Sequence, residues 1–310
     1  MFILGNLKLA EEAFRIARIT DELSTSSITK YRDSVKKFSS VMGSKKFDDL
    51  TLKDFDDFII LMKAGGAENA RIANVISGVK WVIAKLQREA LISNNIDLDR
   101  IKKPKIGHKE QTYLTPEEIE MFVGAILGDM EKNGQIIRTV RFMALIKLLL
   151  QTGCRIGEAL SINTSDIDWR NGEIPIIGKG KKPRKLSLRK DTILWLKKYI
   201  AVRKSEHEAL FVTLKGKSRW QQTDTGRSFR RYRKISGINK YFSIHTIRRT
   251  TATLLFHQGI GPEKVQLILG HTQLETTVKY YLKSAQEQVV KNIMMEDRYF
   301  NFIPQSAISS

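Results

Sequence analysis

The chain of 310 residues contains one cysteine and no long uninterrupted run of apolar residues. A single cysteine, Cys154, cannot form a disulfide within the chain, and it cannot supply a cysteine cluster for a structural metal site. A membrane-spanning helix needs about 18 successive apolar residues, and Lys8, Glu11 and Glu12 interrupt the N-terminal stretch. We therefore expect no signal peptide and no membrane anchor, and the cysteine content fits a reducing cytoplasm.

Acidic residues are also scarce. The chain has 33 Asp and Glu against 53 Lys and Arg, a formal net charge of +20. Evenly spread lysines would serve mainly solubility, but here seven of the thirteen residues 178–190 and five of the eight residues 227–234 are basic. Clusters of this kind suit phosphate groups, so a nucleic acid is the first candidate partner.

Helical periodicity dominates the first hundred residues. Apolar residues recur at three- and four-residue steps from Ser26 to Met42 and again from Ile72 to Leu86. Between these segments, Thr51 with Asp54 three residues later has the pattern of a capping box at a helix start. We therefore predict a small helical domain over residues 1–105.

The segment Ile101–Gln111 is polar and basic, and Pro104 and Gly107 interrupt it. This composition is typical of a linker. We place the linker at residues 106–112 and a second domain at residues 113–310.

The second domain is predicted to be mainly helical. Thr115, Pro116 and Glu118 have the order of a helix N-cap, first-turn proline and capping-box acid. The apolar stretch Arg141–Gln151 predicts another helix. Two strand-like runs within Glu173–Leu188 flank a Gly- and Lys-rich turn and predict a β-hairpin. The fold class is thus mainly α with a small β-sheet.

Five short motifs follow one another in this domain. They are TGCRIGEAL at 152–160, IGKGKK at 177–182, SIHTIRR at 243–249, LGH at 269–271, and a tyrosine, Tyr280, nine residues after that histidine. Each motif alone is weak evidence, but chance does not explain all five in register across about 130 residues. Together they resemble the tyrosine recombinase, or phage-type integrase, family in its Xer-like form. The segments LSTSSITKYRDSVKKF and YLTPEEIEMF extend the resemblance to nearly the whole chain.

The resemblance implies an N-terminal helical core-binding domain of SAM-like fold and an α+β catalytic domain with a C-terminal tail helix. In the family this tail helix docks on a neighbouring protomer, and packing within its own chain is the alternative. Thr246, Ile247 and Arg249 depart from the usual family residues, as does Asn94–Asn95 before the linker. None of these departures removes a catalytic side chain.

Catalytic roles follow from the resemblance and from the chemistry of phosphodiester exchange. Attack on a phosphodiester builds negative charge on its non-bridging oxygens, which a planar guanidinium can stabilise with two hydrogen bonds. The resemblance assigns this role to Arg155 and Arg248. The resemblance also implies that His271 donates a further hydrogen bond. We expect Glu158, one helical turn after Arg155, to support the site.

The resemblance makes Tyr280 the nucleophile, and His245 assists it because a free phenol has a pKa near 10. Tyr281 is adjacent and chemically identical, and only the family spacing favours Tyr280. Alone, either tyrosine would be interpreted as an amphipathic core residue.

A lysine of the hairpin is the general acid in the family, and Lys179, 24 residues after Arg155, is our choice. Two further lysines of the same hairpin compete with it. The candidate DNA-binding residues are Lys30, Lys36, Lys37, Lys181, Lys182, Arg230 and Arg231.

The resemblance implies a site-specific DNA recombinase that cleaves and rejoins DNA through a 3′-phosphotyrosyl intermediate at Tyr280, in integration, excision or resolution. The covalent bond retains the phosphodiester energy, so we expect no cofactor and no metal. The expected partner is a double-stranded DNA target site. On two such sites the chain would form a homotetramer from free monomers or dimers, and accessory proteins could take part. The expected location is the nucleoid in the cytoplasm.

Two alternatives stay open on the sequence. A type IB topoisomerase uses a similar set of side chains but relaxes supercoils as a monomer. A protein that only binds DNA is the non-enzymatic alternative, and the intact Arg155, Arg248 and Tyr280 argue against it.

Overall fold

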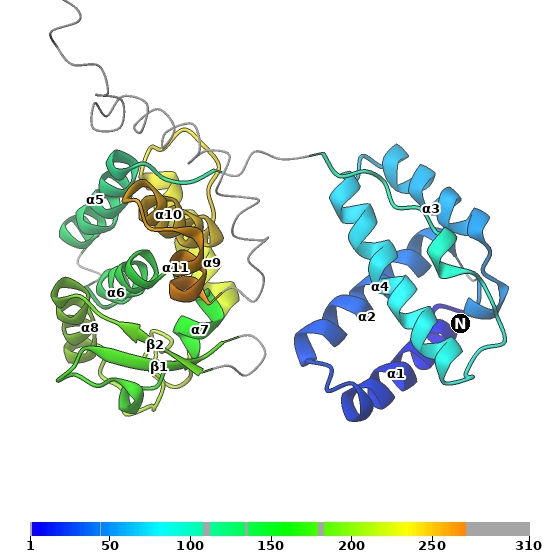
Figure 1. The fold of residues 1–310 in the computed structure, drawn as a ribbon, viewed down its shortest axis with the longest axis horizontal. Helices are drawn as coiled ribbons and strands as arrows, with labels where there is room; N and C mark the ends of the chain where they lie inside the picture. Colours follow the sequence, from blue (N-terminus) through cyan, green and yellow to red (C-terminus); the bar gives the residue numbers. More distant parts are fainter. Residues whose placement is uncertain (1, 44, 108–111, 134–135, 179–182, 271–310) are drawn as a thin grey trace, which may run out of the picture. The chain divides into compact units, whose positions relative to one another are not determined.

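The chain forms two compact units, Met1–Lys109 and Glu110–Ser310 (Figure 1). The boundary between them falls inside residues 106–112, and each unit has an apolar core of its own. The computed structural model describes residues 2–43, 45–107, 112–133, 136–178 and 183–270. The predicted tail helix lies outside these residues.

The first unit is built from helices throughout its described residues. Its elements are α1 (Phe2–Thr20), α2 (Thr25–Met42), η1 (Phe47–Asp49), α3 (Leu52–Ala64), α4 (Asn69–Arg88) and η2 (Leu98–Arg100). The helices predicted from the apolar periodicity are confirmed as α2 and α4, and the one predicted at Thr51 is confirmed as α3. At its start, the backbone amide of Thr51 donates to the Asp54 carboxylate at 2.7 Å, as a capping box requires.

Helices α2 and α4 form the main packing contact of this unit. The rings of Tyr31 and Trp81 stack with their centroids 4.4 Å apart. Next to this pair, an added Cβ at Gly78 would overlap the side chain of Ser34. The missing side chain at Gly78 therefore lets the two helices approach each other closely.

Helix α1 differs from the sequence-based expectation, which placed no element before Ser26. Its buried residues have helical spacing but include three alanines, whose small apolar surface gives a weak periodic signal; they are Asn6, Ala10, Ala13, Phe14 and Ala17. The Asn6 amide donates to the Lys45 carbonyl at 2.8 Å and accepts from the Phe47 amide at 3.1 Å. These hydrogen bonds hold α1 against the segment that leads into α3.

The second unit is mainly helical with one two-stranded sheet, which confirms the predicted fold class. Its elements are α5 (Pro116–Asn133), α6 (Ile136–Thr152), α7 (Ile156–Ser161), η3 (Thr164–Asp166), β1 (Glu173–Ile177), β2 (Pro183–Ser187), α8 (Lys190–Val202), α9 (Gln222–Ile235), α10 (Ile244–His257) and α11 (Pro262–Leu269). The strands pair antiparallel, with Glu173 opposite Ser187 and Ile177 opposite Pro183. Across both units, none of the described helices has the length and apolar character to cross a bilayer.

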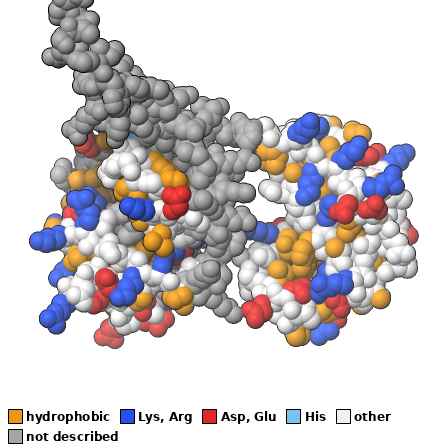
Figure 2. All heavy atoms as spheres, viewed as in Figure 1, with side chains coloured by type: hydrophobic (Ala, Val, Ile, Leu, Met, Phe, Trp, Pro, Cys, Tyr) orange, Lys and Arg blue, Asp and Glu red, His pale blue; other side chains and the backbone are white. Residues whose placement is uncertain are grey.

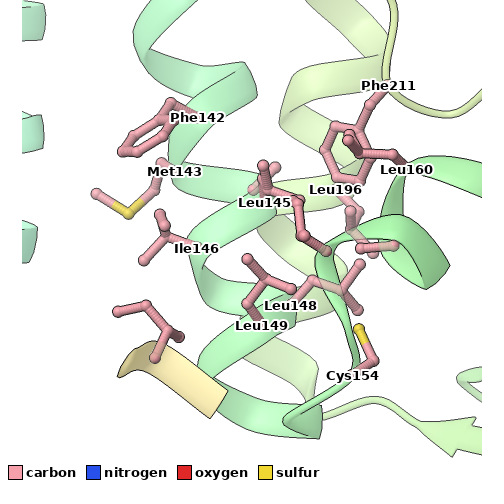
Figure 3. Packing of buried hydrophobic residues seen from close by; sticks show 14 of the residues in the cluster. Phe142, Met143, Leu145, Ile146, Leu148, Leu149, Cys154, Leu160, Leu196 and Phe211 are labelled. Atoms are coloured by element: carbon pink, nitrogen blue, oxygen red, sulfur yellow. The ribbon is translucent and has the colours of Figure 1, made fainter. Parts of the chain in front are cut away.

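Helix α6 is the central element of the second unit, with α5, α8 and α10 packed around it (Figure 1). Every residue from 139 to 146 is buried, so over these two turns the helix is covered on all faces. Figure 3 shows Phe142, Met143, Leu145, Ile146, Leu148 and Leu149 in this core. Cys154 lies in the same core, and burial raises the pKa of its thiol to about 11.

We predict that Leu148→Ala lowers the free energy of unfolding by about 2 to 5 kcal/mol, because the lost methyl groups leave a cavity around α6. Leu194→Ala on α8 is the matched control, because Leu194 is 51% exposed. It should change stability by less than about 0.5 kcal/mol. Urea denaturation followed by circular dichroism compares the two. If both substitutions lowered the free energy of unfolding by the same amount, α6 would not be the centre of the core.

Candidate active site

A tight turn between α6 and α7 carries the first part of the site. Gly153 has a φ of +59°, in the left-handed region that favours glycine. An added Cβ there would overlap the side chain of Leu269 on α11. Two residues later, Arg155 occupies the N-cap position of α7. The absence of a side chain at Gly153 thus allows the turn, and Arg155 with it, to lie against the end of α11.

Arg248 joins this turn to α11. Its Nη1 donates to the Gly153 carbonyl at 2.6 Å, and its Nη2 donates to the Leu269 carbonyl at 2.9 Å. The last carbonyls of a helix carry partial negative charge, so a cation at this end is favourable. One side chain of α10 therefore fixes two segments that are more than 100 residues apart in sequence.

Arg155 reaches the next carbonyl of the same helix end. Its Nη1 and Nη2 both lie 3.4 Å from the carbonyl oxygen of Gly270, the C-cap residue of α11. Gly270 has a φ of +68°, which again favours glycine. The structure thus brings the two predicted arginines to adjacent carbonyl oxygens, at residues 269 and 270.

Glu158 lies beneath Arg155, with a side chain only 8% exposed. Its carboxylate accepts from the Arg155 backbone amide at 2.8 Å, from Arg155 Nη1 at 2.9 Å and from Arg184 Nη2 at 2.9 Å. Burial alone would raise the pKa of Glu158, but the hydrogen bonds from Arg184 and Arg155 hold that pKa below its usual value. The carboxylate is therefore ionised at neutral pH and orients two guanidinium groups.

Arg184 is a site residue that the sequence reasoning missed, because it was counted only as part of a basic cluster. It lies on β2, and its side chain is 15% exposed. The signal that could have found it is strand alternation, since Arg184 shares a strand face with the buried Leu186. A basic side chain on the inward face of a strand needs an acidic partner, which is Glu158.

His245 lies on the first turn of α10, three residues before Arg248 and so on the same side of the helix. The ring is exposed at the surface but partly shielded from water. This shielding, followed by the nearby charges of Arg249 and Arg248, lowers the pKa of His245 from its usual 6.5. A neutral ring at pH 7 can accept a proton.

Other predicted site residues lie outside the described part of the chain; these are Lys179, Lys181, Lys182, His271 and Tyr280. The competing Tyr281 also lies outside it. Among the described residues, no group of His, Cys, Asp or Glu side chains is arranged as a set of metal ligands.

The remaining basic candidates have different surroundings. On α2, Lys30 and Lys36 are exposed and Lys37 is half-buried. On α9, Arg230 is exposed, whereas Arg231 forms an ion pair at 2.7 Å with the buried Asp129. Basic side chains are also widespread, since Figure 2 shows Lys and Arg side chains over the visible face of each unit.

A basic groove of about 620 Å³ in the second unit was not predicted. Its basic lining residues are Arg138, Arg141, Lys215, Lys217 and Arg227. Arg141 is buried, with its guanidinium carbon 3.8 Å from the ring centroid of Trp220, and burial lowers its pKa to about 10. Asp224 also lines the groove and forms an ion pair with Arg227 at 2.7 Å, so the lining is positive overall.

We predict that Gly153→Ala lowers the free energy of unfolding by about 2 kcal/mol, because the new methyl group combines a strained φ with overlap of Leu269. Gly124→Ala on α5 is the control, because nothing lies within 4 Å of its added Cβ. That change should leave stability equal or slightly higher. Urea denaturation measures both. A Gly153→Ala protein as stable as the unmodified chain would show that the turn tolerates a side chain.

We predict that His245 titrates with a midpoint below 6.5. The unfolded chain therefore takes up this proton first as the pH falls, so the contribution of His245 to stability is lost as the pH drops from 6.5 through the lower folded pKa. The ring C–H proton in an NMR titration reports the midpoint, and His245→Gln assigns the signal. A midpoint at or above 6.5 would contradict a pKa lowered by shielding from water and by the charges of Arg249 and Arg248.

The sequence is similar to known proteins over most of its length. The model of the phage integrase family matches residues 112–288, which is more than half of the chain. The chain is 30% identical over 271 residues to a tyrosine recombinase of Thermosipho africanus, covering 86% of this chain and 91% of that protein. It is 27% identical over 307 residues to tyrosine recombinase XerD of Oceanobacillus iheyensis, covering 96% of this chain and 98% of that protein.

Solved structures also share the fold of this chain. The crystal structure of XerH site-specific recombinase bound to palindromic difH substrate, a post-cleavage complex, is similar with a TM-score of 0.71 and 22% identity. The match covers 94% of this chain and 87% of that one. The chain therefore belongs to the phage integrase family of tyrosine recombinases.

Proposed function

We propose that this protein is a site-specific recombinase that cleaves and rejoins double-stranded DNA. Tyr280 attacks a backbone phosphate, which forms a 3′-phosphotyrosine and releases a 5′-hydroxyl. A hydroxyl of a second strand then attacks this bond and releases the tyrosine. The observation that carries the proposal is the convergence of Arg155 and Arg248 on the carbonyls of residues 269 and 270.

The charge at this point suits a phosphate in the transition state. The guanidinium groups of Arg155 and Arg184 both donate to the carboxylate of Glu158, and the guanidinium of Arg248 donates to the carbonyl of Gly153 in the same turn. These four side chains together carry a net charge of +2. The carbonyls of Gly153, Leu269 and Gly270 hold two of the guanidiniums in place without neutralising them. Such fixed donors stabilise charge that develops during the reaction, because they need no reorganisation when it appears.

The proposal adds groups that the sequence supplies outside this cluster. His271 follows Gly270 directly, and Tyr280 lies nine residues further along the chain. In the proposed mechanism His245, whose lowered pKa favours the neutral ring, accepts the phenol proton of Tyr280. Lys179 protonates the leaving 5′-oxygen.

DNA binding is proposed to involve both units. Residues 1–105 act as the core-binding domain with Lys30, Lys36 and Lys37 of α2 facing the duplex, and residues 113–310 act as the catalytic domain. In the second unit, the basic groove and Arg230 offer further cations to phosphates. Binding should weaken steeply with salt, because each phosphate contact releases counterions.

We propose that several copies of the chain assemble on DNA, because exchange of strands needs two DNA sites. Four copies would bind two sites as a homotetramer, through the tail helix beyond Tyr280. We propose that the free protein is a monomer or dimer. We also propose that accessory proteins take part and that the protein is located at the nucleoid in the cytoplasm.

We predict that the unmodified chain forms a covalent DNA adduct, that Tyr280→Phe abolishes it, and that Tyr281→Phe retains it, because the family spacing makes Tyr280 the attacking phenol. The measurement incubates each protein with fragmented DNA from its source, denatures it, and sequences the DNA that stays attached. The captured ends also give the target site.

Three outcomes would change the proposal. Loss of the adduct only in Tyr281→Phe would move the nucleophile by one residue. No adduct with the unmodified chain would favour a protein that only binds DNA. Relaxation of a supercoiled plasmid without recombinant products would favour a topoisomerase.

A further inference from the structure

We infer that Arg184 is a positioning residue for cleavage: it sets the orientation of Arg155 through Glu158 and through the end of α11. This inference rests on the proposed function. It concerns a side chain of the hairpin strand β2, separate from the two arginines already assigned to the phosphate.

The first contact of Arg184 is a two-pronged ion pair. Its Nη2 donates to Glu158 Oε2 at 2.9 Å and its Nη1 to Glu158 Oε1 at 3.3 Å. The same Oε1 accepts from Arg155 Nη1 at 2.9 Å. One buried carboxylate is therefore shared by two guanidiniums, and the position of each depends on the other.

The second contact of Arg184 is with the backbone of Gly270. An added Cβ at Gly270 would overlap the Nη1 and Cζ atoms of Arg184, so the guanidinium lies directly against this residue. The carbonyl of the same Gly270 accepts from both terminal nitrogens of Arg155. Arg184 thus touches both of the groups that hold Arg155.

Removal of Arg184 would leave the Glu158 carboxylate with Arg155 as its remaining side-chain partner among the described residues. A buried carboxylate that loses one cation binds the other more strongly. Arg155 would then be drawn toward Glu158 and away from the Gly270 carbonyl. The positive charge near the phosphate would still be present but misplaced, so the chemical step should suffer more than DNA binding.

The test uses the DNA site captured by the unmodified chain, with a nick that traps the covalent adduct, and protein in excess. The variants are Arg184→Met, Arg184→Lys, Arg155→Ala and the double variant Arg184→Met/Arg155→Ala. Arg170→Met is the control, because Arg170 is an exposed arginine of the same unit and lies in the turn before β1.

We expect Arg184→Met to slow adduct formation by about 10- to 100-fold, with DNA affinity changed less than about threefold. Arg184→Lys should be intermediate, because it keeps the charge without the fork. The double variant should be no slower than Arg155→Ala, because the two residues act as one unit. Arg170→Met should match the unmodified chain.

A second substrate separates positioning from misfolding. A methylphosphonate at the cleaved position replaces one non-bridging oxygen by a methyl group, so the phosphate is neutral and depends less on Arg155. The deficits of Arg184→Met and of Arg155→Ala should both shrink on this substrate, whereas a misfolded protein would be equally inactive on both substrates. If Arg184→Met does not fold, the same comparison with Arg184→Lys decides the matter.

Multiplicative losses in the double variant, or a loss of DNA affinity that accounts for the whole deficit, would overturn the inference in favour of a direct DNA contact. Cleavage by Arg184→Met at the rate of the unmodified chain would overturn it while leaving the proposed function intact. Absence of any adduct with the unmodified chain would overturn the proposed function itself.

Discussion

Hydrogen bonds from arginine side chains to the backbone carbonyls at the end of α11 organise the second unit. Arg248 and Arg155 donate to successive carbonyls at residues 269 and 270, and Arg248 also donates to the turn at Gly153. These bonds bring the start of α7, the part of α10 around Arg248 and the end of α11 close together. The central helix α6 supports them, since its residues 139–146 are all buried and the helix leads directly into the turn.

The acceptors explain how a cluster of arginines persists inside a folded protein. Carbonyl oxygens orient a guanidinium without cancelling its charge, and only Glu158 adds a negative charge among the four side chains. Close approach of the backbone is essential, which is why Gly153 and Gly270 both have positive φ values with no room for a side chain. The cluster is positive and preorganised, which is what a phosphate needs as its charge grows.

Much of this could be predicted from the sequence, because short-range patterns encode it. The apolar periodicity predicted α2 and α4, and the capping box predicted α3. The motif order singled out Arg155 and Arg248, which the structure brings to adjacent carbonyl oxygens. Features that depend on tertiary packing were missed. Helix α1 is buried largely through alanines, whose periodic signal is weak. Arg184 was missed because nothing in the sequence distinguished it from the other basic residues of its cluster. The stacking of Arg141 on Trp220 joins residues far apart in sequence, so no local pattern indicates it.

The most direct measurement of the central claim is to locate the protein–DNA bond by mass spectrometry. The trapped adduct is digested with nuclease and protease, and the fragment that contains Tyr280–Lys283 is sequenced by tandem mass spectrometry. The account predicts a nucleotide remnant joined through phosphate to Tyr280. A remnant on Tyr281, or on a serine or threonine elsewhere in the chain, would contradict it.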